Sequence, residues 1–189
     1  MTDEMTAVFI GSSIRLAMPL ALAATGELVS ERAGVLNMSV EGMMLIGAFG
    51  GALGAWATGS PMLGLAIGVA AALPVALLQA WLSITLRANQ IVTGIGINIL
   101  VLGGTTIAYR EILGRHSRTE IPGLAKWAPP GLGDIAVFGD AVFRQTWLLY
   151  AGLVAIALAA WVLRDTAVGR ARCAFRDTAV AGGAAGHSD

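Results

Sequence analysis

The stretch from Gly42 to Leu86 contains no charged residue and is mostly apolar. A membrane-spanning helix needs about 20 apolar residues at a rise of about 1.5 Å per residue, so this run is too long for one span. The turn sequence Thr-Gly-Ser-Pro at residues 58–61 divides the run. We therefore expect two spans, at residues 42–57 and 62–86, that fold back on each other.

Three further apolar runs have the length of membrane spans, at residues 5–25, 91–109 and 147–163. Hydrophobic residues make up 56% of the chain and charged residues 13%, whereas soluble domains carry about 25% charged residues. These features predict an all-α, polytopic membrane helix bundle of about five helices, in a single transmembrane domain over residues 1–189. The formal net charge of +0 gives no basic patch for a nucleic acid.

Cysteine and histidine are too few for disulfide or zinc chemistry. The chain has one cysteine, Cys173, and two histidines, His116 and His187. We expect no metal and no cofactor. Asp3 and Glu4 replace the basic start of a secretory leader, so we expect the first run to be a retained span.

Basic residues indicate the orientation in the membrane. Four arginines follow the last span, which predicts that the tail at residues 164–189 is cytoplasmic. Five crossings then place the N-terminus and the loop at residues 110–146 outside. The short loops agree, because Arg32 and Arg87 both fall inside. The lipid bilayer is thus an expected partner.

The polar segment from Gly26 to Gly42 lies between two apolar runs and mixes apolar with acidic and amide residues. This composition predicts irregular backbone after the first span, and irregular backbone at membrane depth commonly builds a substrate site. Ser39 is placed to cap the following helix. Glu41 is expected to face protein or a watery cavity rather than lipid.

Two other polar residues lie inside spans. Arg15 interrupts the first run, where it either snorkels to the surface or pairs with an acidic residue of the segment Gly26–Gly42. Asn98 lies within the fourth span. It either bonds a neighbouring helix or contacts a ligand, and we favour the interhelical bond.

Three stretches carry a family resemblance. They are GELVSERAGVLNMSVEGMMLIGAFGGALGA at residues 26–55, LRANQIVTGIGINIL at residues 86–100 and TAVGRARCAFRDTAVAGGAAG at residues 166–186. In this order and spacing they resemble the permease subunits of bacterial ABC importers for nucleosides and simple sugars. The branched-chain amino acid permeases are near relatives, and the family continues with further transmembrane segments, so the chain resembles the front half of a permease.

The resemblance implies an import subunit of the bacterial inner membrane that is not an enzyme. The sequence has no G-x-x-x-x-G-K-[ST] phosphate loop. ATP hydrolysis would belong to a separate ABC ATPase subunit, and substrate would come from an extracytoplasmic binding protein or lipoprotein. A second, unlike permease would complete the pathway as a heterodimer.

The resemblance also implies two sets of functional residues. The tail set departs from the family pattern at Arg172 and Cys173, where an apolar residue and then arginine are usual. The candidates for lining the pathway are Asn37, Ser39, Glu41, Gly42, Asn89, Gln90 and Asn98, and those for contacting the ATPase are Gly169, Cys173, Ala174, Asp177, Ala181 and Gly186.

Other interpretations remain open at this point. A membrane enzyme would need converging catalytic groups, whereas the serines, carboxylates and two histidines here are scattered. A permease of the branched-chain amino acid type and a truncated, non-transporting permease remnant both keep the same motifs. Amide and hydroxyl groups serve ribose, nucleobase and sugar alike, so the residues do not identify the substrate.

Overall fold

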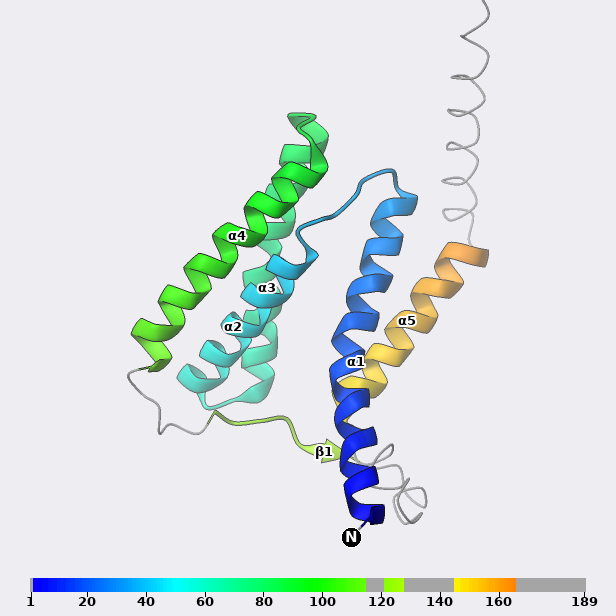
Figure 1. Ribbon diagram of the computed structural model, residues 1–189, viewed down its shortest axis with the longest axis vertical. Coiled ribbons are helices and arrows are strands. Elements are labelled where there is room, and N and C mark those ends of the chain that lie inside the picture. Colours follow the sequence, from blue (N-terminus) through cyan, green and yellow to red (C-terminus); the bar gives the residue numbers. More distant parts are fainter. Residues whose placement is uncertain (1, 115–120, 128–144, 166–189) are drawn as a thin grey trace, which may run out of the picture. The chain divides into compact units, whose positions relative to one another are not determined.

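The computed structural model describes residues 2–114, 121–127 and 145–165. Five helices in this part of the chain are long and apolar enough to cross a membrane. This confirms the expected all-α, multi-span class. The helices are α1 (Thr2–Arg32), α2 (Val40–Thr58), α3 (Pro61–Ala80), α4 (Gln90–Ala108) and α5 (Trp147–Asp165), with π-helical turns η1 (Trp81–Thr85) and η2 (Tyr109–Leu113) and short antiparallel strands β1 (Lys126–Trp127) and β2 (Gln145–Thr146) (Figure 1).

The chain divides into two compact units. One unit comprises Met1–Gly34 together with Ala125–Asp189, and the other comprises Val35–Leu124. The first contains α1, α5 and the strand pair, and the second contains α2, α3 and α4.

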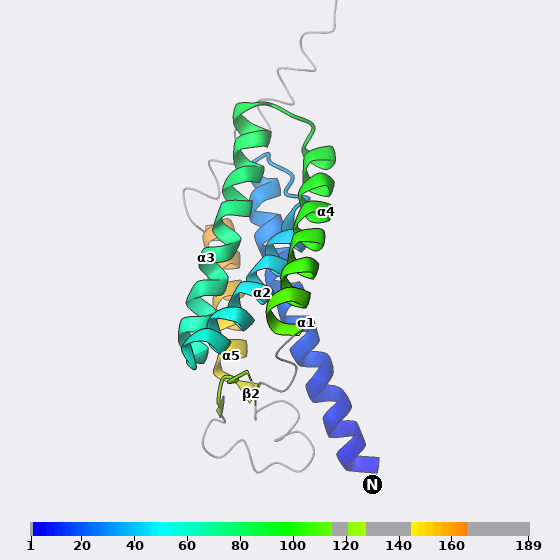
Figure 2. The ribbon, with the colours of Figure 1, turned by 90° about the vertical axis from the view of Figure 1, so that its left-hand side faces the viewer.

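In the second unit, α2 lies between α3 and α4 (Figure 2). The α2–α3 turn follows the sequence signal, because Gly59 adopts a left-handed φ of 67° and Pro61 begins α3. Glycines then bring the two helix backbones together. A Cβ built on Gly68 would lie 2.7 Å from the carbonyl oxygen of Gly47, so no larger residue fits without a shift.

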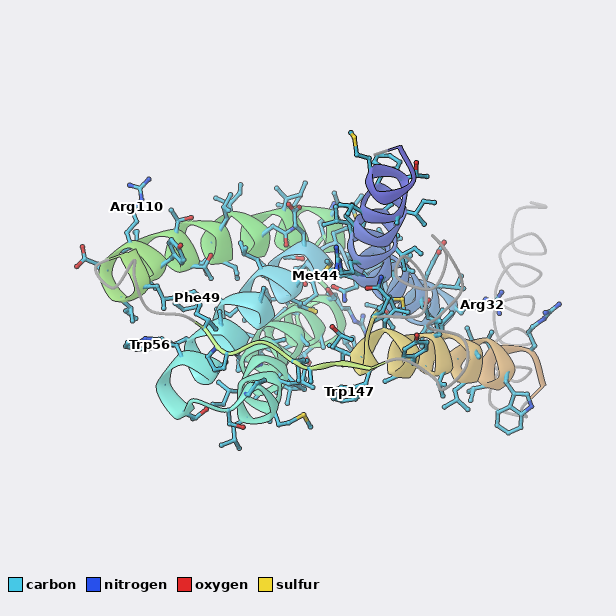
Figure 3. All side chains as sticks on the ribbon, turned by 90° about the horizontal axis from the view of Figure 1, so that it is seen from below. Arg32, Met44, Phe49, Trp56, Arg110 and Trp147 are labelled. Carbon is cyan, nitrogen blue, oxygen red and sulfur yellow. The ribbon has the colours of Figure 1, made fainter. Side chains whose placement is uncertain are left out.

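Helix α4 buries one face, formed by Gly94, Ile97, Val101 and Thr105 at intervals of three or four residues. Phe49 projects from α2 toward α4, whereas Arg110 points away from the ribbon just beyond the end of α4 (Figure 3). Both α3 and α4 continue as π-helical turns. The helix expected at residues 91–109 thus extends to Leu113, where the residues Ile112 and Leu113 are still apolar. The loop expected at residues 110–146 therefore begins after Leu113.

In the first unit, α1 packs against α5. A Cβ on Gly152 of α5 would meet the flexible end of the Met18 side chain on α1, so a larger residue here would displace that side chain. Leu149 and Leu163 of α5 are buried, at 9% and 8% exposure. A glycine thus faces a side chain in this unit, whereas in the other unit glycines face the backbone of the neighbouring helix.

The first helix is longer than its apolar run, which corrects the expectation of irregular backbone from Gly26. Residues of high helix propensity, including Glu27, Leu28 and Glu31, carry α1 on to Arg32. Gly34 has a φ of 84° and donates its N–H to the Glu31 carbonyl at 2.9 Å. The non-helical backbone is therefore confined to residues 33–39.

Because α1 is one continuous helix, Arg15 cannot pair with the two glutamates that lie further along it. Glu27 lies 12 residues further along the same helix, which places it about 18 Å away along the axis, and Glu31 is more distant still. An ion pair between Arg15 and either glutamate is therefore geometrically impossible. The Arg15 side chain is exposed within its unit.

Candidate functional site

The backbone that leads into α2 is organised by Asn37. Its Oδ1 accepts hydrogen bonds from the Ser39 N–H at 3.2 Å and from the Ser39 hydroxyl at 2.9 Å. Ser39 is fully buried and is the N-cap residue of α2, but its side chain makes no capping bond. The expected capping role of the Ser39 side chain is therefore wrong: its hydroxyl is turned toward Asn37 rather than toward the first N–H groups of α2.

Asn98 of α4 supplies the missing cap from another helix. Its Oδ1 accepts from the Gly42 N–H at 2.8 Å, and its Nδ2 donates to the Met38 carbonyl at 2.9 Å. Gly42 is the third residue of α2, where an N-cap side chain would normally bond. The favoured interhelical role of Asn98 is thus confirmed.

Two glycines let the carboxamide of Asn98 reach this position. A Cβ on Gly42 would lie 2.8 Å from the Asn98 Oδ1, and one on Gly94 would lie 2.8 Å from the Met38 carbonyl carbon. Real Cβ atoms essentially never approach other atoms so closely. Gly94 therefore permits the close approach of α4 to Met38, just before α2, and Gly42 leaves space for the Asn98 carboxamide.

Asn89 and Gln90 support the same end of the unit. The Asn89 Oδ1 accepts from the N–H groups of Ile91 and Val92 at 3.0 and 3.2 Å and so caps α4. The Gln90 Oε1 accepts from the Leu36 N–H at 2.6 Å and ties the segment before α2 to α4. Both amide oxygens thus hold backbone in place.

Beside this junction is a groove of about 260 Å³, which we call the α2/α4 groove. Glu41, Gly42 and Asn98 are the three sequence candidates that line it. Glu41 is exposed, and its carboxylate has no hydrogen-bond partner among the described residues. The groove thus presents one free carboxylate on an otherwise largely apolar surface, whose remaining residues are Leu45, Ile95, Ile99 and Leu102.

The sequence reasoning missed these four apolar residues. Three of them lie on α4, at residues 95, 99 and 102, which is the spacing of one helix face, and Leu45 lies on α2. That periodicity could have been read, but apolar residues in a membrane span face lipid, protein or groove with the same pattern. Asn37, Ser39, Asn89 and Gln90 do not line the groove.

The proposed ATPase contact is in the tail. Its candidate residues fall outside the described part of the chain, so they stay a prediction: Gly169, Cys173, Ala174, Asp177, Ala181 and Gly186.

Comparison with known proteins gives the class. The family model described as the branched-chain amino acid transport system permease component matches residues 9–188. The chain therefore belongs to this family of membrane-spanning permease components, in agreement with its five membrane-length helices. No solved structure shows a significant match.

The names of three individual relatives are more specific than the family description. The guanosine ABC transporter permease protein NupQ of Bacillus subtilis is 38% identical over 166 residues, 82% of this chain and 50% of that protein. TsgC13 of Haloferax volcanii, provisionally named a glucose ABC transporter permease protein, is 36% identical over 78% of this chain and 45% of its own length. The nucleoside ABC transporter permease protein NupC of Lactococcus lactis is 29% identical over 82% of this chain and 50% of its own. The chain thus spans about half the length of these relatives.

Proposed function

We propose that this chain is a membrane-spanning permease subunit of an ATP-driven ABC importer and forms part of the pathway for nucleosides or simple sugars. Family membership and five membrane-length helices support this assignment. The names of its relatives support both substrate classes, because two of them name guanosine or nucleosides and one names glucose.

The observation that carries the proposal is the free carboxylate of Glu41 in the α2/α4 groove. A carboxylate is an acceptor for hydroxyl and amino groups, which sugars and nucleosides both present. The apolar side chains of Ile95, Ile99 and Leu102 would cover the flat or less polar face of such a molecule. Among the residues that the structure describes, none that lines this groove is basic, so it suits an uncharged substrate better than a phosphorylated one.

The test is Glu41→Gln in the complete transporter, with uptake of labelled guanosine and labelled glucose measured separately. Loss of a hydrogen bond to a charged group is worth about 1.5–3 kcal/mol, so we expect uptake at low substrate concentration to fall about 10- to 100-fold. Glu31→Gln is the matched control, because Glu31 is also an exposed helical glutamate but lies on α1.

Membrane abundance and recovery of the ATPase with the permease should be unchanged by Glu41→Gln. Wild-type uptake of both substrates by this variant would remove the groove from the pathway. The substrate whose uptake falls identifies the branch to which the transporter belongs.

The partners are also part of the proposal. A separate ABC ATPase would supply energy, an extracytoplasmic binding protein or lipoprotein would deliver substrate, and a second permease would complete the pathway. A pathway built between repeats or subunits needs surfaces from both sides. We therefore expect vesicles that contain only this chain and an ATPase to take up neither guanosine nor glucose, and uptake by them would contradict the need for a second permease.

The proposed orientation places the N-terminus outside and the tail in the cytoplasm. Cys173 is the one cysteine of the chain, so thiol labelling shows on which side of the membrane the tail lies. A membrane-impermeant maleimide should label it in inside-out vesicles and not in intact cells. Slower labelling when the ATPase subunit is added would support the tail contact, whereas labelling from outside would overturn the orientation.

A further inference from the structure

We propose that Asn98 is a positioning residue for Glu41: it holds the first turn of α2 so that the Glu41 carboxylate stays in the α2/α4 groove. This inference rests on the proposed function of that groove. Asn98 contributes through the backbone of α2, so it would not itself need to touch the substrate.

The two bonds of Asn98 enclose Glu41 in the sequence. They anchor the carbonyl of Met38, three residues before Glu41, and the N–H of Gly42, one residue after it. The direction of the Glu41 side chain follows from the backbone at these positions. When both ends of this short segment are fixed to α4, the carboxylate has a defined place beside the groove.

No other described group replaces this anchor. The first N–H groups of any helix lack partners within the helix, and in an apolar surrounding an unsatisfied N–H is costly. The Oγ of Ser39 would be the usual acceptor for these N–H groups, but it makes no capping bond, and the hydroxyl donates to the Asn37 Oδ1. Loss of the Asn98 carboxamide would therefore free the first turn of α2.

Asn98 also sits on the helix that carries the apolar side of the groove. Ile95, Ile99 and Leu102 line it from α4, and Glu41 lines it from α2. The same carboxamide thus fixes the distance between the carboxylate and the apolar residues. The contact between Gly94 and Met38 leaves no space for the helices to approach further.

A direct ligand role would leave Asn98 one N–H of its Nδ2 and one lone pair of its Oδ1 for a substrate. Both its carboxamide oxygen and nitrogen already bond to backbone, at 2.8 and 2.9 Å. A substrate bonded there would lose its contact with Asn98 whether or not Glu41 is present, whereas a positioning role acts through Glu41. Positioning and direct binding therefore predict different behaviour when Glu41 and Asn98 are changed together.

The first experiment is a double-mutant cycle in the complete transporter. Initial rates of labelled guanosine uptake, with glucose as the second probe, give KM and maximal rate for Glu41→Gln, Asn98→Ala and the double variant. If Asn98 acts through Glu41, Asn98→Ala should raise KM about 10-fold in the wild-type background and less than 2-fold in the Glu41→Gln background. Thr106→Val is the control on α4, because the Thr106 hydroxyl bonds only within its own helix, to the Leu102 carbonyl.

The second experiment needs no transport. In a Cys173→Ser background, a spin label at Glu41→Cys reports the mobility of the first turn of α2 in purified protein in nanodiscs. Asn98→Ala should increase the mobility of this label and leave that of a label at Ala57→Cys, at the far end of α2, unchanged. Asn98→Asp keeps the acceptor for the Gly42 N–H, so the label should have an intermediate mobility in this variant. Asn98→Asp also replaces Asn98→Ala in the experiment if Asn98→Ala does not fold.

The outcomes separate the two proposals. Unchanged uptake in Glu41→Gln overturns the proposed function of the groove. Reduced uptake in Glu41→Gln together with an equal effect of Asn98→Ala in both backgrounds leaves that function standing and overturns the positioning role. The positioning role is also overturned if the label at position 41 is as immobile in both Asn98 variants as it is with Asn98 present.

Discussion

Two contacts of the same helix, α2 against α3 and α2 against α4, are built in different ways. Against α3, glycine meets glycine, and a Cβ on Gly64 or Gly68 would collide with the backbone of α2. Against α4, glycines again allow the approach, but a polar side chain, Asn98, joins the helices through two backbone bonds. One contact depends on shape alone, and the other depends on shape and on hydrogen bonds.

The difference shows how this unit combines a scaffold with a site. Lipid gives helices no hydrophobic reason to associate, so close packing of small residues stabilises the α2–α3 hairpin. A polar junction between α2 and α4 adds directional bonds and leaves Glu41 beside a groove. We expect changes in the hairpin to affect stability, and changes in the junction to affect stability and transport together.

The largest effect should come from Gly68→Val in the hairpin. Its Cβ would lie 2.7 Å from the Gly47 oxygen and 3.2 Å from the Gly51 Cα, so the helices must separate. We expect a loss of about 3 kcal/mol in the free energy of unfolding, at the upper end for overpacking. Denaturant unfolding in detergent, followed by circular dichroism, measures it. Gly96→Val is the control, because nothing lies within 4 Å of a Cβ at Gly96, and an equal loss there would contradict the packing account.

Asn98→Ala should come next, because it removes the two bonds that define the junction. The Gly42 N–H and the Met38 carbonyl would both lose their partner. Gly42 is buried whereas Met38 is exposed, so the unpaired Gly42 N–H carries most of the expected loss, about 1–3 kcal/mol in the free energy of unfolding. The same unfolding measurement applies. A loss no greater than that of Thr106→Val would show that the junction adds no stability of its own.

Ser39→Ala should have a smaller effect. Its hydroxyl makes one hydrogen bond, to the Asn37 Oδ1, and does not cap α2. We expect a loss of about 1 kcal/mol, the ordinary value for one hydrogen bond. A loss as large as that of Asn98→Ala would mean that Ser39 stabilises the start of α2 as much as Asn98 does, contrary to the geometry.

The smallest effect should come from Gln79→Met on α3. Gln79 is 2% exposed and donates to the Ser83 hydroxyl at 3.1 Å, but its Oε1 has no partner in the described part of the chain. Replacing a poorly satisfied buried amide by an apolar side chain of similar length can be nearly neutral. We therefore expect a change within about 0.5 kcal/mol in unfolding, and a loss of 2 kcal/mol or more would reveal a partner for this oxygen.

The sequence by itself determined the class and most of the spans. The charge-free run from Gly42 to Leu86 and the turn at residues 58–61 were enough to predict α2 and α3, because crossing a bilayer demands length and apolarity. The end of α1 was missed, because residues 26–32 are polar enough for a loop and yet favour helix. Local composition cannot choose between these two states.

Only the tertiary structure decided the partners at the junction. The sequence singled out Asn98 and Ser39 as polar residues in an apolar chain, but the bonds of Asn98 join backbone groups 56 and 60 residues away. Which of the two residues caps α2 depends on how closely α4 approaches, which Gly94 permits, and on the space that Gly42 leaves for the carboxamide. Asn98 caps α2 in place of Ser39 because a hydrogen bond depends on distance and angle in space, whereas a sequence pattern records only which groups are able to make one.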